Sequence, residues 1–346
     1  MLVNGYGGDS MVSMKDIAKV CNVSESTVSK ALKGHPLIKR ETRRRIQEVA
    51  LKYNYQPNAI VESMQTGRSR TIGIAYNNFY DSFAGAILTG VFEKLCAAGY
   101  EAIIICWDEL VSQDVSVLSR FSRRRVDGLL LFPPGKLPSS KYLKELRAFH
   151  NPIVVIDQTW PGNDFNYVGS DNMRGAALAT EHMIERGISD IGFIKYSTVS
   201  SGVERWQGFV ETMQKHGLPV KDSWCVDTGG LPDYGQDLIL KMLSQPDRPE
   251  GLVCFNDYCA YHVASAAYEL GISIPEELSI VGFGDIHMLS SLMQPKLTTV
   301  KQFPEDIGRK AAGILLGAIE KNKEVSASKN ILMPVELISR DSVRQQ

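Results

Sequence analysis

The sequence contains no apolar run that approaches the ~20 residues a membrane-spanning helix needs. Its first residues carry neither the basic segment nor the apolar segment of an export signal. The six cysteines form no C-x-x-C pair, and most of them lie in apolar segments, so we interpret them as reduced core thiols. These absences predict a cytoplasmic protein that makes no contact with membranes.

The sequence also lacks the short motifs that accompany common enzymatic chemistry. It has no G-x-S-x-G, no Walker A, no H-E-x-x-H and no nucleotide-binding G-x-G-x-x-G at a strand–helix turn. The six histidines show no metal-ligand spacing. We therefore expect no catalytic residues, no metal site and no cofactor.

Charge is distributed unevenly along the 346 residues, which are enough for two or three domains. Residues 1–70 contain 12 Lys and Arg against 6 Asp and Glu, a net charge of +6. The remaining residues contain 26 against 33, a net charge of −7. This asymmetry predicts a head that faces nucleic acid, joined to an acidic body that would not bind a polyanion.

The basic segment has the pattern of a helix-turn-helix unit. Ser13 and Asp16 have the S-x-x-D spacing of a capping box, which predicts the start of a first helix. Ser24 is placed to cap a second helix, and Gly34 is placed to end it. A third helix is expected to turn one face inward, made of Ile46, Val49, Ala50 and Tyr53.

In such a unit the second helix enters the major groove of DNA by its N-terminal end. The residues expected to be exposed there are Ser24, Glu25, Ser26, Thr27, Ser29 and Lys30. A Glu can accept from cytosine N4, a Lys can donate to guanine O6 and N7, and hydroxyl groups can serve bases or phosphates. Each residue alone is typical of a solvated helix face, but together, after a capped turn, they predict DNA contact.

From Thr71 onward, short apolar runs alternate with helix-length amphipathic segments. The runs predicted as strands are 71–77, 100–107, 126–133, 152–157, 188–194, 251–257 and 278–285. The segments predicted as helices lie near 82–98, 112–124, 139–149, 172–187, 202–216, 234–245, 257–270 and 304–321. This alternation predicts an α/β body of two doubly wound subdomains, whose parallel sheets are covered by helices on both faces.

Polar residues follow several of the predicted strands. Because ligands bind beyond the carboxyl ends of strands in open sheets, Asp157, Asn256 and Asp285 are candidates to hold a sugar-like or heterocyclic polar ligand. Asp257 and Asp285, each taken alone, are more typical of residues that cap the next helix. Trp160 can stack on a ligand ring, although an aromatic residue beside a Pro-Gly turn more often packs within its own loop.

Longer motifs recur along the whole chain. In the head they are K-D-I-A-x-x-x-x-V-S-x-x-T-V-S-x-x-L-x-G, E-T-R, Y-x-P-N-A and T-G-R-x-x-T-I-G. In the body they include V-G-S-D-N-x-x-G-A (168–176), E-R-W-Q-G-F (204–209), F-N-D-Y-x-A (255–260), G-I-S-I-P-E-E-L-S-I-V-G-F-G-D (271–285), L-T-T-V-K-Q (297–302) and L-I-S-R-D-S (337–342). Together these motifs resemble those of the LacI/GalR (lactose-repressor) family of bacterial transcription regulators.

The resemblance implies a homodimeric regulator, most often a repressor, that binds a near-palindromic operator in double-stranded DNA. It implies that Glu25, Ser26 and Lys30 contact bases. It also implies that residues 58–66 form a hinge helix in the minor groove, which places Asn58 and Met64 at the DNA.

The resemblance further implies that the body is related to periplasmic sugar-binding proteins. By position, Phe83, Asp157, Arg205 and Asn256 would line a cleft for a small polar effector, with a sugar or a sugar derivative expected. Within R-x-x-G-F, Arg205 would donate in two directions to oxygen atoms of the ligand. Helices near 82–98 and 257–270 are expected to pair the two subunits.

Four positions depart from the family pattern. Met64 stands where the family usually inserts a Leu into the central base step, and Glu62 stands where Arg is common. Lys39 replaces a capping residue at the third helix. Gly284 stands where the family usually has an Asp that binds ligand hydroxyls, so the carboxylate is either supplied by Asp285 from a shifted loop or absent.

The expected organisation is a disordered extension over residues 1–10, a helix-turn-helix domain over 11–56, a hinge helix and linker over 57–69, and an effector-binding and dimerisation domain of two interleaved subdomains over 70–346. Two other functions stay open at this point. One is a solute-binding module without a transcriptional role, which would require export. The other is an enzyme built on the same sheet topology.

Overall fold

The computed structural model describes residues 12–55, 63, 66–76, 82–106, 116–133, 139–229, 231, 233–321 and 329–345. The chain divides into two compact units, Met1–Ser69 and Arg70–Gln346. Below, the described residues 12–55 are called the head and residues 70–345 the body, and each is considered by itself.

The head consists of α1 (Met14–Cys21), α2 (Glu25–Leu32) and α3 (Arg40–Lys52) around a small apolar core. Ile17, Val28 and Ile46, one from each helix, are fully buried in that core. Because every helix contributes only one apolar stripe, none of the three would be stable without the other two.

Local capping sets the helix boundaries of the head as predicted. Ser13 and Asp16 form a complete capping box at the start of α1. The Ser24 side chain accepts a hydrogen bond from the Thr27 amide, with N and Oγ 3.2 Å apart, at the start of α2. Lys39 provides no side-chain cap for α3, which confirms the predicted loss. Tyr53 was expected on the inner face of α3, but it follows the helix and is 39% exposed, so this expectation was wrong.

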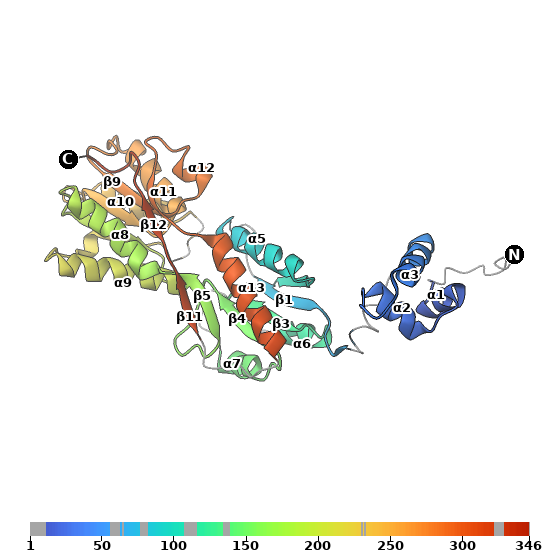
Figure 1. The fold of residues 1–346 in the computed structure, drawn as a ribbon. Helices are drawn as coiled ribbons and strands as arrows, with labels where there is room; N and C mark the ends of the chain where they lie inside the picture. Colours follow the sequence, from blue (N-terminus) through green and yellow to red (C-terminus); the bar gives the residue numbers. More distant parts are fainter. Residues whose placement is uncertain are drawn as a thin grey trace. The chain divides into compact units, whose positions relative to one another are not determined.

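The body contains two six-stranded sheets with helices on both faces (Figure 1). The strands are β1 (Thr71–Tyr76), β2 (Glu101–Cys106), β3 (Gly128–Leu131), β4 (Ile153–Ile156), β5 (Asn166–Ser170), β6 (Ile191–Lys195), β7 (Cys225–Asp227), β8 (Gly251–Cys254), β9 (Ser279–Gly284), β10 (Thr298–Lys301), β11 (Asn330–Met333) and β12 (Glu336–Ile338). The helices are α5 (Ser82–Ala97), α6 (Ser116–Arg123), α7 (Ser140–Arg147), α8 (Asn172–Glu185), α9 (Ser200–Lys215), α10 (Gln236–Leu243), α11 (Asp257–Glu269), α12 (His287–Ser290) and α13 (Pro304–Lys321), with a short 3-10 turn at Asp222–Trp224.

The strand order is β11-β5-β4-β3-β1-β2 in the first sheet and β12-β10-β9-β8-β6-β7 in the second. All recorded pairings are parallel except the one between β10 and β12. Strand order reverses beside β1 in the first sheet and beside β6 in the second, which is the doubly wound arrangement predicted from the sequence.

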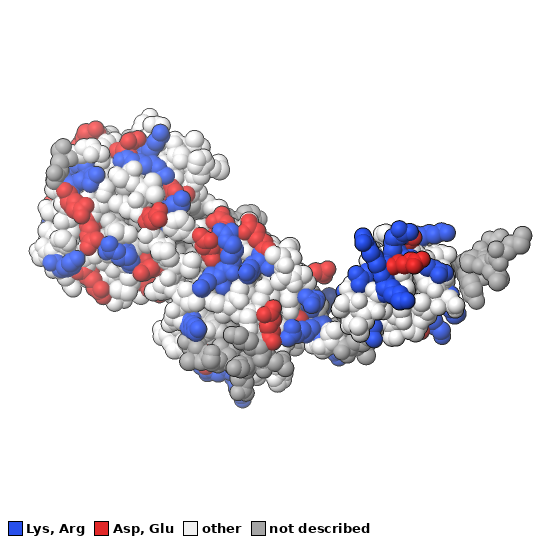
Figure 2. Space-filling model, in the orientation of Figure 1, with Lys and Arg blue, Asp and Glu red and all other residues white. Residues whose placement is uncertain are grey.

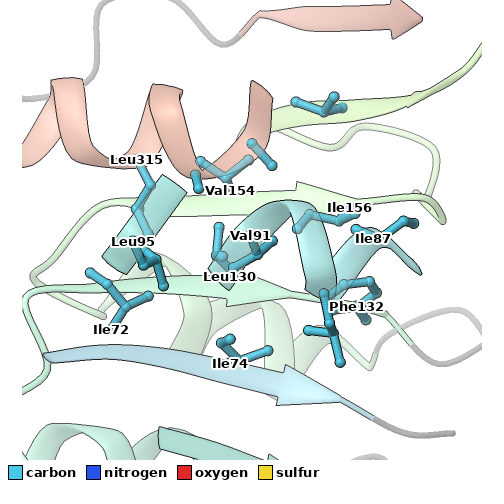
Figure 3. Packing of buried hydrophobic residues seen from close by; sticks show 14 of the residues in the cluster. Ile72, Ile74, Ile87, Val91, Leu95, Leu130, Phe132, Val154, Ile156 and Leu315 are labelled. Atoms are coloured by element: carbon cyan, nitrogen blue, oxygen red, sulfur yellow. The ribbon is translucent and has the colours of Figure 1, made fainter. Parts of the chain in front are cut away.

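Each sheet is buried on both faces, which explains its nearly continuous apolar strands. In the first lobe, α5 and α13 cover one face of the sheet, where Ile72, Leu130 and Val154 pack against Leu315 of α13 (Figure 3). Side chains of α6 and α7 pack into the cluster on the other face. In the second lobe, α10 and α11 contribute to one core cluster and α8 and α9 to the other.

The described chain passes between the two sheets at three places. The first connects β5 to α8, the second connects β10 to α13, and the third connects β11 to β12. The two lobes are therefore interleaved in sequence, because α13 and β11 complete the first lobe after β6–β10 of the second lobe, and β12 then returns to the second sheet.

Candidate DNA-contacting helix and ligand site

The N-terminal end of α2 presents polar groups to solvent. Ser24, Glu25, Ser26 and Lys30 are exposed, and Thr27 and Ser29 are half-buried. The Ser24 hydroxyl lies 2.9 Å from Ser26 Oγ and 2.8 Å from Thr27 Oγ1, so this first turn is held in one arrangement by its own hydroxyl groups. An ordered first turn suits base recognition, since less side-chain freedom is lost on binding.

Basic side chains also gather elsewhere on the head. Figure 2 shows Lys and Arg side chains gathered over α3 on the face in view, with few acidic groups between them. Arg43 is partly committed to the fold, because its Nη2 donates to the His35 and Ile38 carbonyl oxygens at 2.9 and 3.3 Å. Arg44 pairs with Glu48 at the surface, whereas the other basic groups supply the field that attracts phosphates. Asn58, Glu62 and Met64 lie outside the described residues.

In the body, Arg205 is the most constrained of the predicted ligand-binding residues. It lies on α9 and is only 4% exposed. Its Nε donates to Asn172 Oδ1 at 2.9 Å, its Nη1 to the Phe255 carbonyl oxygen at 2.6 Å, and its Nη2 to Gln302 Oε1 at 3.3 Å. The guanidinium also lies 3.6 Å from the centre of the Phe283 ring, so its plane is fixed by stacking as well as by hydrogen bonds.

These three bonds leave part of the Arg205 fork available to a ligand, because a guanidinium carries five N–H donors. Two of the partners belong to crossovers between the lobes: Asn172 begins α8 and Gln302 follows β10. Ser170, at the end of β5, donates to the same Gln302 oxygen at 2.8 Å. Arg205 is thus anchored at the hinge between the two sheets.

Asp157 follows β4 in the first lobe and has the left-handed backbone conformation, with φ at 67°. Asp tolerates this region better than most side chains. The turn is fixed by the buried Tyr167 hydroxyl, which donates to the Asp157 carbonyl oxygen at 2.8 Å, and by the Asp157 amide, which donates to the Val168 carbonyl oxygen at 3.0 Å. Strain maintained by such contacts is typical of functional sites.

Electrostatics links Asp157 of the first lobe with Arg205 of the second. Burial lowers the pKa of Arg205 to about 10, and the Asp157, Glu204 and Asp257 carboxylates oppose that shift. Burial also raises the pKa of Glu204, whose Oε2 accepts a hydrogen bond from Asn172 Nδ2 at 2.8 Å. A buried cation with carboxylates in its electrostatic surroundings suits a neutral polyhydroxyl ligand, since donors and acceptors are both present.

Asn256 and Asp257 both make hydrogen bonds that stabilise the junction between β8 and α11. Asn256 caps α11, with its Oδ1 accepting from the Cys259 amide at 2.8 Å, which leaves its amide nitrogen as a donor. Asp257 is fully buried and accepts hydrogen bonds from Thr299 Oγ1 at 2.6 Å and from the Ile286 amide at 2.7 Å. Desolvation raises the pKa of Asp257 to about 6.

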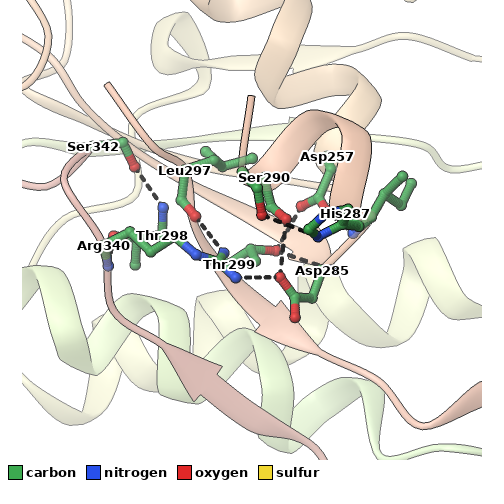
Figure 4. A network of polar contacts seen from close by, with 11 residues as sticks. Asp257, Asp285, His287, Ser290, Leu297, Thr298, Thr299, Arg340 and Ser342 are labelled. Atoms are coloured by element: carbon green, nitrogen blue, oxygen red, sulfur yellow. Dashed lines mark hydrogen bonds and ion pairs between the residues drawn. The ribbon is translucent and has the colours of Figure 1, made fainter. Parts of the chain in front are cut away.

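Asp285 lies after β9 and takes part in a separate polar network (Figure 4). Its Oδ1 accepts from Arg340 Nη2 at 2.6 Å and from Ser290 Oγ at 3.0 Å. Arg340 also donates to the Leu297 carbonyl oxygen at 2.7 Å, which attaches the C-terminal segment to the β9–β10 region. Oδ1 of Asp285 is therefore committed to contacts within the fold.

Gly284 has φ at 136°, a conformation that L side chains rarely adopt. The backbone here is therefore suited to glycine and not to the Asp of the family pattern. Phe83 begins α5 and is half-buried against the core of the first lobe. Trp160 is 5% exposed and lies in a core cluster, 6.3 Å from the Phe165 ring, so it packs within its own lobe.

Comparison with known proteins agrees with both halves of this description. A model described as bacterial regulatory proteins of the lacI family matches residues 13–58, and a periplasmic binding protein-like domain matches residues 180–343. The probable HTH-type transcriptional repressor ExuR of Bacillus subtilis (strain 168) is 31% identical, with 97% of this chain and 99% of the relative covered. The chain belongs to the lacI family of bacterial regulatory proteins.

Two further relatives of this lacI-family chain give the same result. The HTH-type transcriptional repressor PurR of Haemophilus influenzae (strain PittEE) is 31% identical, with 96% of this chain and 99% of the relative covered. The structure of a lac repressor dimer bound to operator and an anti-inducer has a TM-score of 0.84 and 21% identity, covering 96% of this chain and 99% of that one. At that identity the likeness concerns the fold alone.

Membership of the lacI family confirms the predicted fold class and the prediction of a DNA-binding transcription regulator. Within the part of the chain that the structure describes, no helix is both long and apolar enough to cross a membrane. Among the same residues, no group of three or more His, Cys, Asp or Glu is arranged to hold a metal ion.

The sequence did not single out several polar partners of the ligand site: Asn172, Glu204, Gln302, Gln158, Ser200 and Ser201. A signal was present for some of them, because Asn172 and Gln302 lie inside quoted family motifs and Gln158 directly follows Asp157. Their contacts join segments that are far apart in sequence, and no local pattern predicts such contacts.

Proposed function

We propose that this protein is a dimeric, cytoplasmic transcriptional repressor. A small polar effector, sugar-like in its chemistry, would bind between the two lobes of the body. Its binding would either lower or raise the affinity of the protein for its operator. The observation that carries the proposal is Arg205. Its guanidinium is buried and stacked on an aromatic ring, yet part of its fork is available beside Asp157 of the other lobe.

The proposed effector site contains Phe83, Asp157, Arg205 and Asn256. Asp157 would accept from ligand hydroxyls, Arg205 and the Asn256 amide would donate to ligand oxygens, and Phe83 would cover an apolar face. Asp285 is the least favoured member, since its Oδ1 already has two partners, and we keep it as a candidate to be tested by substitution.

At the DNA, we propose that Glu25, Ser26 and Lys30 contact bases while Ser24, Thr27 and Ser29 position the helix and contact phosphates. Asn58 and Met64 are proposed to contact the minor groove. Two heads would bind half-sites about 34–36 Å apart, one helical turn of DNA, on a near-palindromic operator.

Pairing of two copies through α5 and α11 is supported by the surface of α11. Tyr261 is 50% exposed and Tyr268 is 89% exposed on this helix, and Leu270 follows it with 39% exposure. Aromatic and aliphatic groups exposed together are enriched at interfaces between subunits. Phe92 on α5 is also partly exposed, at 36%.

A regulator of this kind needs no catalytic group, and we propose that the protein has no enzymatic activity. A solute-binding role without DNA is the alternative; the basic head and its exposed Lys30 and Glu25 favour the regulator. The same body topology supports binding in both cases.

Two measurements on the full chain test the proposal. An operator selected from random DNA should bind with an affinity that falls steeply with salt, because released counterions dominate the binding free energy. A log–log slope near zero would exclude phosphate-based binding. A thermal-shift screen of sugars, sugar phosphates and nucleobases should give a ligand that stabilises the body and changes operator affinity. A stabilising ligand without effect on DNA binding would favour the solute-binding alternative.

A further inference from the structure

Helix α9 starts without a cap of its own. Its N-cap residue is Val199, which offers no side-chain hydrogen bond to the first turn. The first four amides of a helix lack partners within the helix, and Ser, Thr, Asp or Asn usually supplies one at the N-cap. The first turn of this 16-residue helix of the second lobe therefore lacks a side-chain cap from its own N-cap residue.

The missing cap comes from the first lobe. Gln158, directly after Asp157, reaches the start of α9, and its Oε1 accepts from the Ser201 amide at 3.2 Å and from the Ser200 hydroxyl at 2.9 Å. Ser200 Oγ in turn accepts from the Thr159 amide of the first lobe at 2.9 Å. Contacts therefore run in both directions between the lobes at this point.

The other end of the same carboxamide faces the proposed effector site. Gln158 Nε2 donates to Asp157 Oδ2 at 3.0 Å and to Ser201 Oγ at 2.9 Å. A carboxamide has two N–H donors and can accept two hydrogen bonds at its oxygen. All four of these hydrogen-bonding sites are used in the Gln158 side chain. The carboxylate of Asp157 fixes which end is nitrogen, because only an N–H group can face it.

We propose that Gln158 is a positioning residue that couples effector binding to closure of the two lobes. It caps α9 from the opposite lobe, and with the same side chain it holds the carboxylate of Asp157. This inference rests on the proposed effector site at Asp157 and names the step by which that site would regulate the body.

The coupling follows from shared hydrogen bonds. An effector hydroxyl that binds Asp157 Oδ2 would share that oxygen with Gln158 Nε2, so binding would alter the hydrogen bond that orients the side chain capping α9. Opening of the lobes, in turn, removes the cap from α9 and releases Asp157 from its orientation. Ligand and closure thus act on one side chain, as reciprocal coupling between two equilibria requires.

Hydrogen exchange of the full-length protein, without DNA or effector, tests this role. Gln158→Ala should speed exchange at the Ser201 amide, its direct partner, and also at the Thr159 amide, which Gln158 does not contact with its side chain. We expect about fivefold or more at both, the effect of one ordinary hydrogen bond lost. Gln207→Ala is the matched control, because Gln207 is an exposed residue of α9 whose Nε2 bonds only within the helix, to Glu211 at 2.8 Å.

Gln158→Glu separates positioning from simple filling of space. Glu has the same shape but lacks the Nε2 donors and places a second carboxylate beside Asp157, so exchange at both amides should exceed that of Gln158→Ala. Two results would overturn the proposal. One is exchange at the wild-type rate at both amides in Gln158→Glu, and the other is an unchanged exchange rate at the Thr159 amide in Gln158→Ala. Should Gln158 variants fail to fold, Ser200→Ala and Ser201→Ala remove the same contacts from the second lobe, and unchanged exchange in both would equally overturn it.

The capping role is independent of the proposed function, whereas its coupling to ligand rests on the effector site at Asp157. Exchange reports on lobe contacts whether or not the protein binds DNA, so failure of operator binding would leave this inference standing. Conversely, normal operator binding with an effector response and unaltered exchange in the variants would remove only the role of Gln158.

Discussion

Arg205→Ala should destabilise the body strongly while leaving the head folded. The substitution deprives Asn172 Oδ1, the Phe255 carbonyl and Gln302 Oε1 of one charged donor each. It also leaves Asp157, Glu204 and Asp257 without the cation that offsets them. Because three buried acceptors stay behind and each unsatisfied buried group costs about 1–3 kcal/mol, the expected cost is about 3–5 kcal/mol, toward the lower end of the sum.

The assay is equilibrium urea unfolding followed by a tryptophan signal, together with thermal unfolding by circular dichroism. A loss of 3–5 kcal/mol corresponds to a midpoint lower by roughly 6–20 °C for a domain of this size. Arg174→Ala is the matched control: Arg174 lies on the neighbouring helix α8, and its side chain is 54% exposed in a surface pair with Glu181. Its removal should cost less than about 1 kcal/mol.

The functional readout separates stability from signalling. At a temperature where both variants are folded, Arg205→Ala should bind operator and fail to respond to effector. A change in stability below about 1 kcal/mol would refute the claim that Arg205 organises the hinge. A normal effector response would remove Arg205 from the ligand site.

Three other predictions concern single side chains. Burial raises the pKa of Asp257 to about 6, so the native state binds more protons than the unfolded state between about pH 4 and 6, and stability falls as pH rises through that window. Asp257→Asn removes this titration: relative to wild type, its unfolding free energy should rise by about 2 kcal/mol from pH 4 to pH 7 in urea titrations, and a constant difference would contradict the assignment. Asp285→Ala should lower body stability by about 1–3 kcal/mol through loss of the Arg340 pair, with effector affinity unchanged within twofold in calorimetry; a tenfold loss of affinity would make Asp285 a ligand-binding residue. Lys30→Ala should cost about 1–3 kcal/mol on the selected operator and relax preference at one base pair, whereas an equal loss on all sequences would identify a phosphate contact.

The sequence was most informative where structure is local. Capping at Ser13 and Ser24 depends on residues three apart, and both caps form as predicted. The seven long apolar runs all contain strands, because a strand buried on both faces must be apolar throughout.

Five short strands were not predicted, because they lack a long apolar run. β5, β7, β10, β11 and β12 are three to five residues long and several carry polar side chains. Asn166 of β5 is buried, but its Oδ1 accepts from the Lys329 amide at 3.1 Å, so a polar residue is satisfied by a segment more than 160 positions away. Such pairing leaves no periodicity in the local sequence.

The candidate site shows the same division. Asp157 and Asn256 were accessible to prediction because they end apolar strands, and strand ends meet at one edge of a sheet. The partners of Arg205 come from residues 172, 255 and 302, and the cap of α9 comes from the other lobe, so only the fold brings them together. The absence of a capping residue at Val199 was the one local sign that α9 needed help from elsewhere.

The interleaved path of the chain has a consequence for synthesis on the ribosome. The head, with its own core, emerges first and can fold as soon as α3 has left the exit tunnel. The first lobe has no such opportunity: Leu315 of α13 and strand β11 must cover and extend a sheet whose β1 was made about 240–260 residues earlier. The face that α5 covers only in part therefore stays incompletely buried until α13 has been made. The nascent body is a natural client for chaperones, and a ribosome stalled before residue 304 would release a folded DNA-binding unit attached to an aggregation-prone chain.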